Sequence, residues 1–177
     1  PYTTEIDLYN FTLKGKHDYN KYQNPLDLIK IGVFDKWIAN MDRRKDNPNI
    51  LIDSSVTKYR FIPIDNTQSF ANQNNYKNLK ISIMDTINNK SILNSQITKS
   101  ISKFANSKNY SNLAKEISSN IEKSIDLIEL VFENIPSEFG LSKQGKNKIK
   151  DILSDKPRNN IISSSYLNYS KWNHLIV

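Results

Sequence analysis

Two acids and an amide are spaced along the first third of the chain in a way that suits phosphoryl transfer. Asp42 and Asn47 lie five residues apart in a polar segment, and Asp65 follows an apolar stretch farther on. One carboxylate can orient or deprotonate an attacking hydroxyl, while an amide oxygen and a second carboxylate can hold Mg²⁺ on nucleotide phosphates. Kinase catalytic loops place base and amide at this spacing, and the metal-binding acid at a later strand end. The three residues are therefore candidates for a phosphotransfer site.

Three neighbours in the polar segment are further candidates. Asn49 could compete with Asn47 as the metal ligand, because both carry an amide oxygen. Lys45 could contact phosphate, since it belongs to the same turn. Arg43 has a structural alternative: it could pair with a nearby carboxylate and brace the loop.

The same residues also have plain structural interpretations. Asp, Asn and Pro favour turns for local reasons, so residues 41–48 could be a solvated turn without a function. Asp65 could likewise be an ordinary acid at a strand end. The elements on either side of the segment favour the functional interpretation, because they are what a catalytic loop needs to hold it in place.

A helix is predicted before the segment. Asn24 can cap its first amides, and Pro25 suits the first helical position because its missing N–H would have no partner there. Apolar residues then recur at steps of three and four, which predicts a helix to about Asn40. Trp37 is expected to be a core residue that acts indirectly, by fixing where Asp42 lies.

A β-hairpin is predicted after the segment. Residues 49–52 and 58–64 are apolar enough for two short strands, and the polar residues 53–55 suit a turn. Such a hairpin would return Asp65 to the side of the loop.

These stretches together resemble the catalytic core of HipA-like kinases, and related strings occur in phosphoinositide kinases. The resemblance covers about residues 24–70, and it is faint beyond them except in the turn at residues 135–139 and the helix after it. It is carried by Trp37-Ile38-Ala39-Asn40-Met41-Asp42-Arg43, Asn47-Pro48-Asn49-Ile50-Leu51-Ile52 and Ile62-Pro63-Ile64-Asp65.

The resemblance implies a role for each candidate. Asp42 would be the catalytic base, and Asn47 and Asp65 would bind Mg²⁺ beside ATP. Two departures from the pattern bear on activity: Arg44 stands where relatives often carry His, and Asn66-Thr67 replaces the Phe-Gly of ordinary protein kinases. The resemblance also implies a serine/threonine-type kinase that acts on a protein substrate. Many kinases of that family belong to toxin–antitoxin systems, which implies an antitoxin chain as a partner.

The rest of the chain predicts helices. Residues 5–13 suggest a strand or an extended linker, and residues 80–86 a short strand. Helices are expected over residues 91–104, 111–133 and 142–153, and from Pro157 onward. The fold class expected is α+β and mostly α-helical: a protein-kinase-like C-terminal lobe whose small β-hairpin carries the catalytic loop and the metal-binding acid.

Composition limits the other possibilities. Cysteine is absent, which excludes disulfides and thiolate zinc sites and fits the cytoplasm. His17 and His174 are too few and too far apart to suggest zinc. No apolar run could cross a membrane. The net charge of +7 permits contact with nucleic acid, but no aromatic and basic recognition motif accompanies it, so direct nucleic-acid binding is not expected.

The parts of a kinase that cover ATP are not evident. Only four glycines occur, none in a phosphate-cradling loop, and a strand Lys before the catalytic loop is not apparent. We expect one domain over residues 1–177: a junction to a missing N-terminal lobe (1–23), a catalytic core (24–70) and a helical subdomain (71–177). Transfer by this chain alone is not expected, and a catalytically inactive kinase-like interaction module remains the alternative.

Overall fold

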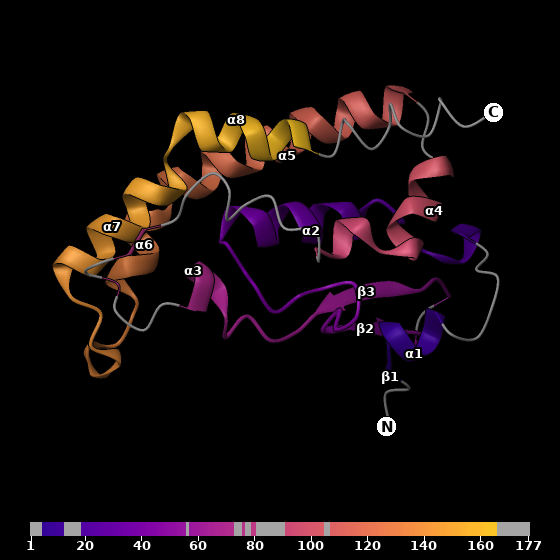
Figure 1. Cartoon of the computed structure of the whole chain (residues 1–177), viewed down its shortest axis with the longest axis horizontal. Helices are drawn as coiled ribbons and strands as arrows, with labels where there is room; N and C mark the ends of the chain where they lie inside the picture. Colours follow the sequence, from indigo (N-terminus) through magenta and orange to yellow (C-terminus); the bar gives the residue numbers. More distant parts are fainter. Residues whose placement is uncertain are drawn as a thin grey trace.

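The computed structural model describes residues 5–12, 19–55, 57–72, 76, 79–80, 91–104 and 107–165. The fold is α+β and mostly helical, as expected (Figure 1). The elements are, in order, β1 (Glu5–Asp7), α1 (Leu8–Thr12), η1 (Tyr19–Lys21), α2 (Asp27–Trp37), β2 (Ile50–Asp53), β3 (Arg60–Pro63), α3 (Ser69–Asn72), η4 (Ile92–Asn94), α4 (Gln96–Phe104), α5 (Ser107–Asp126), α6 (Ile128–Glu133), η5 (Ser137–Phe139), α7 (Lys143–Leu153) and α8 (Lys156–Ser165).

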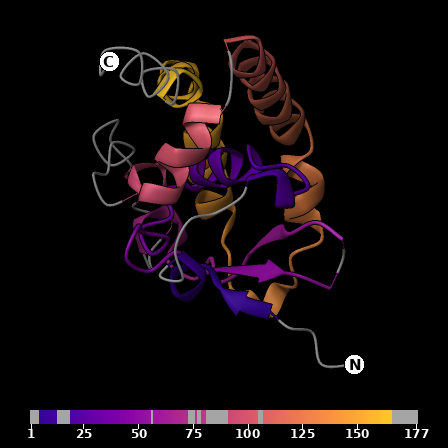
Figure 2. The same ribbon diagram turned by 90° about the vertical axis from the view of Figure 1, so that its right-hand side faces the viewer.

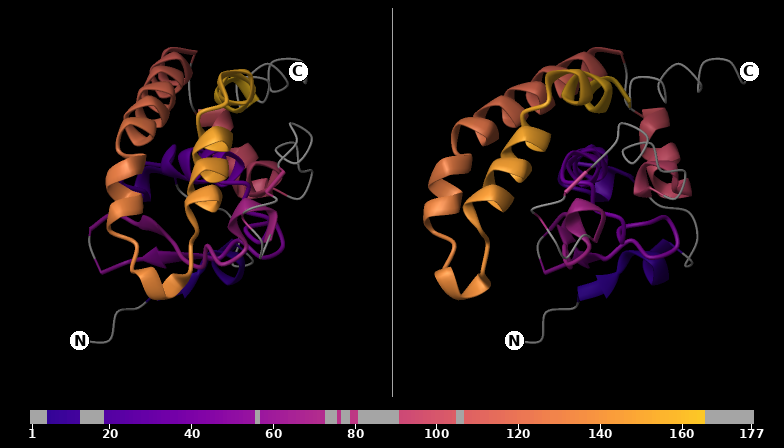
Figure 3. Two further views of the ribbon diagram at one scale, coloured as in Figure 1. Left: turned by 90° about the vertical axis from the view of Figure 1, so that its left-hand side faces the viewer. Right: turned by 60° about the vertical axis from the view of Figure 1, so that its left-hand side comes forward.

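Helix α2 lies between a small sheet and a layer of later helices. Figures 1 and 2 show the sheet on one side of α2, and α5 and α8 on the other. Figure 3 shows α5 to α8 curving around this centre. None of the helices within the described ranges is both long and apolar enough to cross a membrane.

The predicted hairpin is present, and it belongs to a larger sheet. Strands β2 and β3 pair antiparallel with Ile52 opposite Phe61. Strand β1 adds to the other edge of β2, with Ile6 opposite Ile52, so the sheet has three strands in the order β1-β2-β3. Residues 5–13 therefore contain a short strand followed by α1. Ile50 and Ile52 of the central strand are fully buried, as hydrophobic burial favours.

Helix α2 is shorter than the sequence predicted. Asn24 does not cap it; its side-chain Nδ2 donates instead to Asp27 Oδ1 over 2.7 Å, and the helix begins at Asp27. It ends at Trp37 because Ala39 has a left-handed backbone with φ of 49°. Ile29, Val33 and Trp37 are buried as predicted, whereas Phe34 is 46% exposed.

Leu153 and Arg158, far along the chain, form hydrogen bonds with the last turn of α2. Trp37 Nε1 donates to the carbonyl of Leu153 over 3.1 Å. The buried guanidinium of Arg158 donates to the carbonyls of Lys36 and Trp37 over 2.7 and 2.6 Å. A cation there satisfies carbonyls that a helix end leaves without partners and complements the helix dipole. The start of the polar segment is thereby fixed to α7 and α8.

The long helix expected over residues 111–133 is divided into α5 and α6 at Leu127. The apolar residues of this stretch recur at helical steps and predict one buried stripe that ends at Val131, but Val131 is 56% exposed and Phe132 is buried instead. The stripe advances from Ile128 by four residues and not by three. Pro136 follows the end of α6, in keeping with the resistance to helix of the residue before a Pro.

The remaining helices follow the predictions with small shifts. Ser142 caps α7 by accepting from the amide of Gly145 over 3.2 Å. The stretch expected as one helix over residues 91–104 is divided into η4 and α4, and α8 begins one residue before Pro157. The predicted strand at residues 80–86 falls almost wholly outside the described residues, as do His17 and His174.

Candidate functional site

The polar segment after α2 brings three of the predicted residues together. The carboxylate of Asp42 accepts from Asn47 Nδ2 over 3.3 Å and from Asn49 Nδ2 over 2.8 Å. A turn closed by backbone hydrogen bonds between Arg44 and Asn47, of 2.8 and 3.2 Å, sets this arrangement. Lys45 lies exposed in that turn.

The side chain of Arg43 is fully buried and connects the elements on either side of the polar segment. Its guanidinium forms a buried ion pair with Asp35 of α2. It also donates to the carbonyl of Ile64 over 2.6 Å and to Asn66 Oδ1 over 3.1 Å. The bracing role suggested for Arg43 is therefore confirmed. One side chain joins the helix before the segment to the end of the strand after it.

Asp65 lies between the two residues that Arg43 holds. Its backbone is left-handed, with φ of 57°, and its side chain is exposed. Asp65 Oδ1 accepts from the backbone amide of Thr67 over 3.0 Å and from the Thr67 hydroxyl over 2.6 Å. These bonds, and more weakly the charge of Arg43, lower the pKa of the Asp65 carboxyl. Asp65 is thus ionised at neutral pH, and its side chain is hydrogen-bonded to Thr67 and not to Asp42.

A backbone hydrogen bond connects the segment that contains Asp42 with the strand end that leads to Asp65. The amide of Ile64 donates to the carbonyl of Asn49 over 2.9 Å. Asn49, which contacts Asp42 through its side chain, is therefore also bonded to the residue before Asp65. Asn49 itself has a left-handed backbone, with φ of 45°, a conformation that Asn adopts more readily than most residues.

Two residues that support Asp42 were not predicted. Asn40 Oδ1 accepts from the amide of Asp42 over 3.1 Å, and Asn40 Nδ2 donates to Asp35 Oδ1 over 3.2 Å. Burial raises the pKa of Asp35 to about 6, against the opposing effects of Arg43 and Asn40. One feature of the sequence could have indicated this network: a charged residue, Asp35, stands among the apolar positions of the predicted helix.

The departure at residues 66 and 67 also has a structural role. Asn66 Oδ1 accepts from Arg43, and Thr67 holds Asp65 as described. The next residues pair with the end of α2, since the amide of Phe70 donates to the carbonyl of Ile38 over 2.7 Å. Phe70 has a left-handed backbone, so α3 is a turn and not a regular helix. Phe70 packs edge-on against Tyr76.

The side chains of Asn47, Asn49 and Asp65 retain oxygen atoms of the kind that a hard cation takes as ligands. Asn47 and Asn49 each use an amide nitrogen toward Asp42, so each retains an amide oxygen, and Asp65 Oδ2 lies outside the turn with Thr67. Amide and carboxylate oxygens are the ligands that Mg²⁺ prefers. Among the described residues, no group of three or more His, Cys, Asp or Glu side chains could hold a metal. Any cation here would need the Asn oxygens as well.

Comparison with protein families gives one match. The model of the HipA-like kinase family matches residues 17–161, which extends well beyond the stretch whose motifs suggested it. Searches of curated proteins and of solved structures gave no match. The matched range contains Asp42, its two Asn neighbours, Arg43 and Asp65, together with α2 and the helices that hold it. The chain therefore belongs to the family of HipA-like kinases.

Proposed function

We propose that this chain is the catalytic lobe of an ATP- and Mg²⁺-dependent protein kinase of serine/threonine type. The observation that carries the proposal is the carboxylate of Asp42 held by two Asn side chains, one of which, Asn49, is also bonded through its carbonyl to Ile64, the residue before Asp65. Family membership supports the reaction class. The arrangement supports the assignment of roles within it.

In the proposed site, each residue has a separate task. Asp42 accepts the proton of the attacking hydroxyl, and its two amide donors keep the carboxylate oriented. The amide oxygen of Asn47 and the carboxylate of Asp65 hold Mg²⁺, with Asn49 as the competing amide and Lys45 as a phosphate contact. Bound Mg²⁺ would neutralise charge on the nucleotide phosphates.

The proposal also covers the group that accepts the phosphoryl group and the proteins that this chain binds. A protein hydroxyl is the acceptor implied by the family, and an antitoxin chain and a cytoplasmic location go with it. A separate N-terminal lobe would cover the nucleotide. Activity is therefore to be measured on the complete protein, and metal and nucleotide binding on either form.

One observation favours the second candidate, a kinase-like interaction module without catalysis. Thr67 occupies Oδ1 of Asp65 with two hydrogen bonds, so a bound metal would have to share that oxygen or use Oδ2 alone. Binding of ATP with Mg²⁺ but no transfer in the complete protein would support this candidate over the kinase.

The variant Asp65→Asn tests the proposal. Asn tolerates the left-handed backbone at this position, so folding should be retained. We expect phosphoryl transfer to be abolished and the Mg²⁺-dependent part of the ATP-induced rise in melting temperature to disappear. Undiminished transfer by Asp65→Asn would refute the assigned role.

A further inference from the structure

Asn40 is a buried polar residue directly before the polar segment that contains Asp42. It is 8% exposed and lies two residues before Asp42. Its Oδ1 accepts from the backbone amide of Asp42 over 3.1 Å. Its Nδ2 donates to Asp35 Oδ1 over 3.2 Å, and to Asn66 Oδ1 over a longer distance of 3.4 Å. One carboxamide therefore joins the backbone of Asp42 to helix α2 and to the residue after Asp65.

The partners of Asn40 allow only one orientation of its carboxamide. The backbone amide of Asp42 can only donate, so it must face Oδ1. The carboxylate of Asp35 and Asn66 Oδ1 both accept from the guanidinium of Arg43, so both present an acceptor to Nδ2. The position thus requires an acceptor and a donor as two separate groups on one short side chain. Ala has neither group, and Ser has one oxygen atom in place of the two.

The contacts of Asn40 differ in kind from those of Asn47 and Asn49. The latter two bond to the carboxylate of Asp42, but they follow it within the same stretch of chain. They orient the carboxylate within that stretch and do not place the stretch against α2. Asn40 does so through its side chain and through its own backbone amide, which donates to the carbonyl of Asp35 over 2.7 Å. The position of Asp42 relative to α2 therefore depends in part on Asn40.

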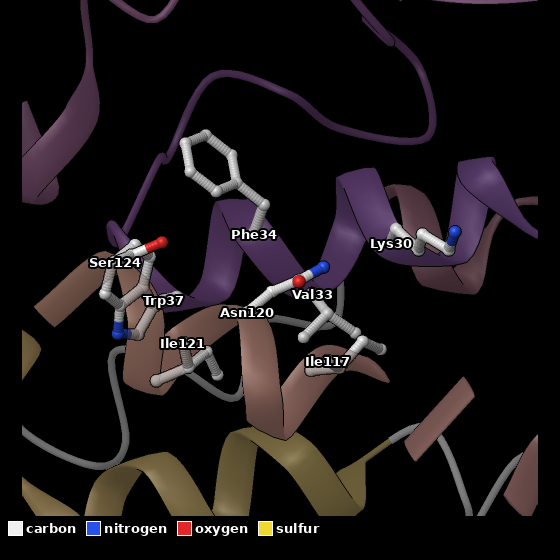
Figure 4. Close-up of a pocket in the computed structure, with 8 residues that line it drawn as sticks. All are labelled: Lys30, Val33, Phe34, Trp37, Ile117, Asn120, Ile121 and Ser124. Atoms are coloured by element: carbon white, nitrogen blue, oxygen red, sulfur yellow. The ribbon is translucent and has the colours of Figure 1, made fainter. Parts of the chain in front are cut away.

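Helix α2 is itself held by later parts of the chain. Trp37 of α2 faces Ile117 and Ile121 of α5, and the three side chains line a small pocket between the two helices (Figure 4). The hydrogen bonds from Arg158 hold the last turn of α2 from the other end of the chain. A side chain that is bonded to Asp35 is therefore tied to the helical layers of the fold.

We propose that Asn40 is a positioning residue for phosphoryl transfer, which holds the backbone at Asp42 where the carboxylate can accept the proton of the attacking hydroxyl. This inference rests on the proposed function, since it takes Asp42 as the general base. Asn40 does not act on the hydroxyl itself, because its Oδ1 and Nδ2 are both bonded to protein groups. A displacement of about 1 Å at a reacting group can lower a rate about 10²-fold. Loss of Asn40 therefore slows the chemical step.

The test compares Asn40→Ala and Asn40→Ser in the complete protein with a matched control, Asn24→Ala. Ala removes every hydrogen bond of the Asn40 side chain. Ser keeps an oxygen that can accept from the amide of Asp42, as hydroxyls do in local turns, but it has no group in the place of Nδ2. Asn24→Ala also removes an Asn-to-Asp hydrogen bond, of 2.7 Å, at the opposite end of α2. Melting temperatures show whether each variant is folded, and Asn40→Ser decides the test if Asn40→Ala does not fold.

We expect kcat at saturating ATP and Mg²⁺ to fall about 10–10²-fold in both Asn40 variants, as for a misplaced reacting group. KM for ATP should change less than kcat, because the lost interaction acts on the chemical step. Asn24→Ala should keep the kcat of the wild type. The proposal is overturned if only KM rises in Asn40→Ala, if its kcat is unchanged, or if Asn24→Ala loses as much. An unchanged kcat in Asn40→Ser would also overturn it, because the local turn alone would then suffice.

A second measurement separates failure of this inference from failure of the proposed function. In NMR spectra of this chain without nucleotide, the side-chain amide signals of Asn47 and Asn49 report on the carboxylate of Asp42 that they contact. Both signals should shift in Asn40→Ser and stay in place in Asn24→Ala. If the signals shift but the wild type transfers no phosphoryl group, the proposed function fails while Asn40 still positions Asp42. Signals that stay in place in Asn40→Ser overturn the inference.

Discussion

Arg43 and Asp35 form a buried ion pair that joins the candidate catalytic loop to helix α2. The same guanidinium binds the carbonyl of Ile64 next to Asp65. This side chain, together with the backbone hydrogen bond from Ile64 to Asn49, therefore fixes where Asp65, the proposed metal-binding acid, lies relative to the segment of Asp42.

Removal of Arg43 should destabilise the fold strongly. Arg43→Ala would leave Asp35 as a buried carboxylate without its cation, and loss of one partner of a buried pair costs about 3–5 kcal/mol. The matched control is Lys150→Ala, which breaks the exposed pair with Glu129 and should cost at most about 1 kcal/mol. Urea unfolding of both variants measures the difference. Equal urea midpoints for the two variants would contradict the proposed structural role of the buried Arg43–Asp35 pair.

The raised pKa of Asp35 should appear in the pH dependence of stability. Its pKa in the folded protein is about 6, against an ordinary value of 3.8. Between these values the folded state binds more protons than the unfolded state, so this group makes the free energy of unfolding fall as pH rises from 4 to 6. Asp35→Asn removes this titrating group. The free energy of unfolding of the wild type, measured relative to that of Asp35→Asn, should therefore fall as the pH rises from 4 to 6.

Other carboxylates should not obscure this measurement. Hydrogen bonds from Ser55 and then Arg60 lower the pKa of Asp53 to about 2. Its contribution is present above pH 4 and is lost only as the pH falls below that value. A difference between wild type and Asp35→Asn that stays constant from pH 4 to 6 would show that Asp35 titrates normally.

Loss of the Asp42 carboxylate should remove transfer and leave nucleotide binding. Asp42→Asn in the complete protein should lower the transfer rate about 10²–10⁴-fold, the usual contribution of a general base. The control is Asp46→Asn, which changes an exposed acid in the same turn and should leave the rate within about twofold, as surface changes usually do. A radiolabelled phosphate assay distinguishes the two; similar rates for both would rule out Asp42 as the base.

Substitution of Asn47 and of Asn49, whose side-chain amides contact Asp42, should affect Mg²⁺ affinity to different extents. Asn47→Ala should weaken Mg²⁺ binding directly if Asn47 is the metal ligand. For Asn49 the informative variant is Asn49→Gly, because Gly accepts the left-handed backbone without strain. Calorimetric titration of Mg²⁺ with ATP bound compares them. A larger loss of affinity in Asn49→Gly would move the ligand role to Asn49.

The sequence predicted the parts of the site that depend on local pattern. The spacing of Asp42 and Asn47 lies within one turn, and the hairpin before Asp65 follows from two short apolar stretches. The structure confirms the hairpin and brings Asn47 and Asn49 to Asp42. Their roles in metal binding remain predictions.

The parts that could not be predicted depend on contacts between distant residues. Arg158 binds the end of α2 from more than a hundred residues away, and no periodicity reveals it. Strand β1 joins the sheet through pairing with β2, which its short alternation could not specify. The early end of α2 depends on a left-handed backbone at Ala39, a conformation that Ala rarely adopts and that tertiary contacts must impose.

The most direct test of the central claim is paramagnetic relaxation by Mn²⁺, measured by NMR on this chain with ATP present. Mn²⁺ takes the same oxygen ligands as Mg²⁺ and broadens the signals of nearby nuclei. If Asn47 and Asp65 hold the metal beside Asp42, the amide signals of these three residues should be lost first, while those of exposed acids such as Asp126 persist. Broadening that spares residues 42, 47 and 65, or that affects exposed acids equally, would contradict the assignment.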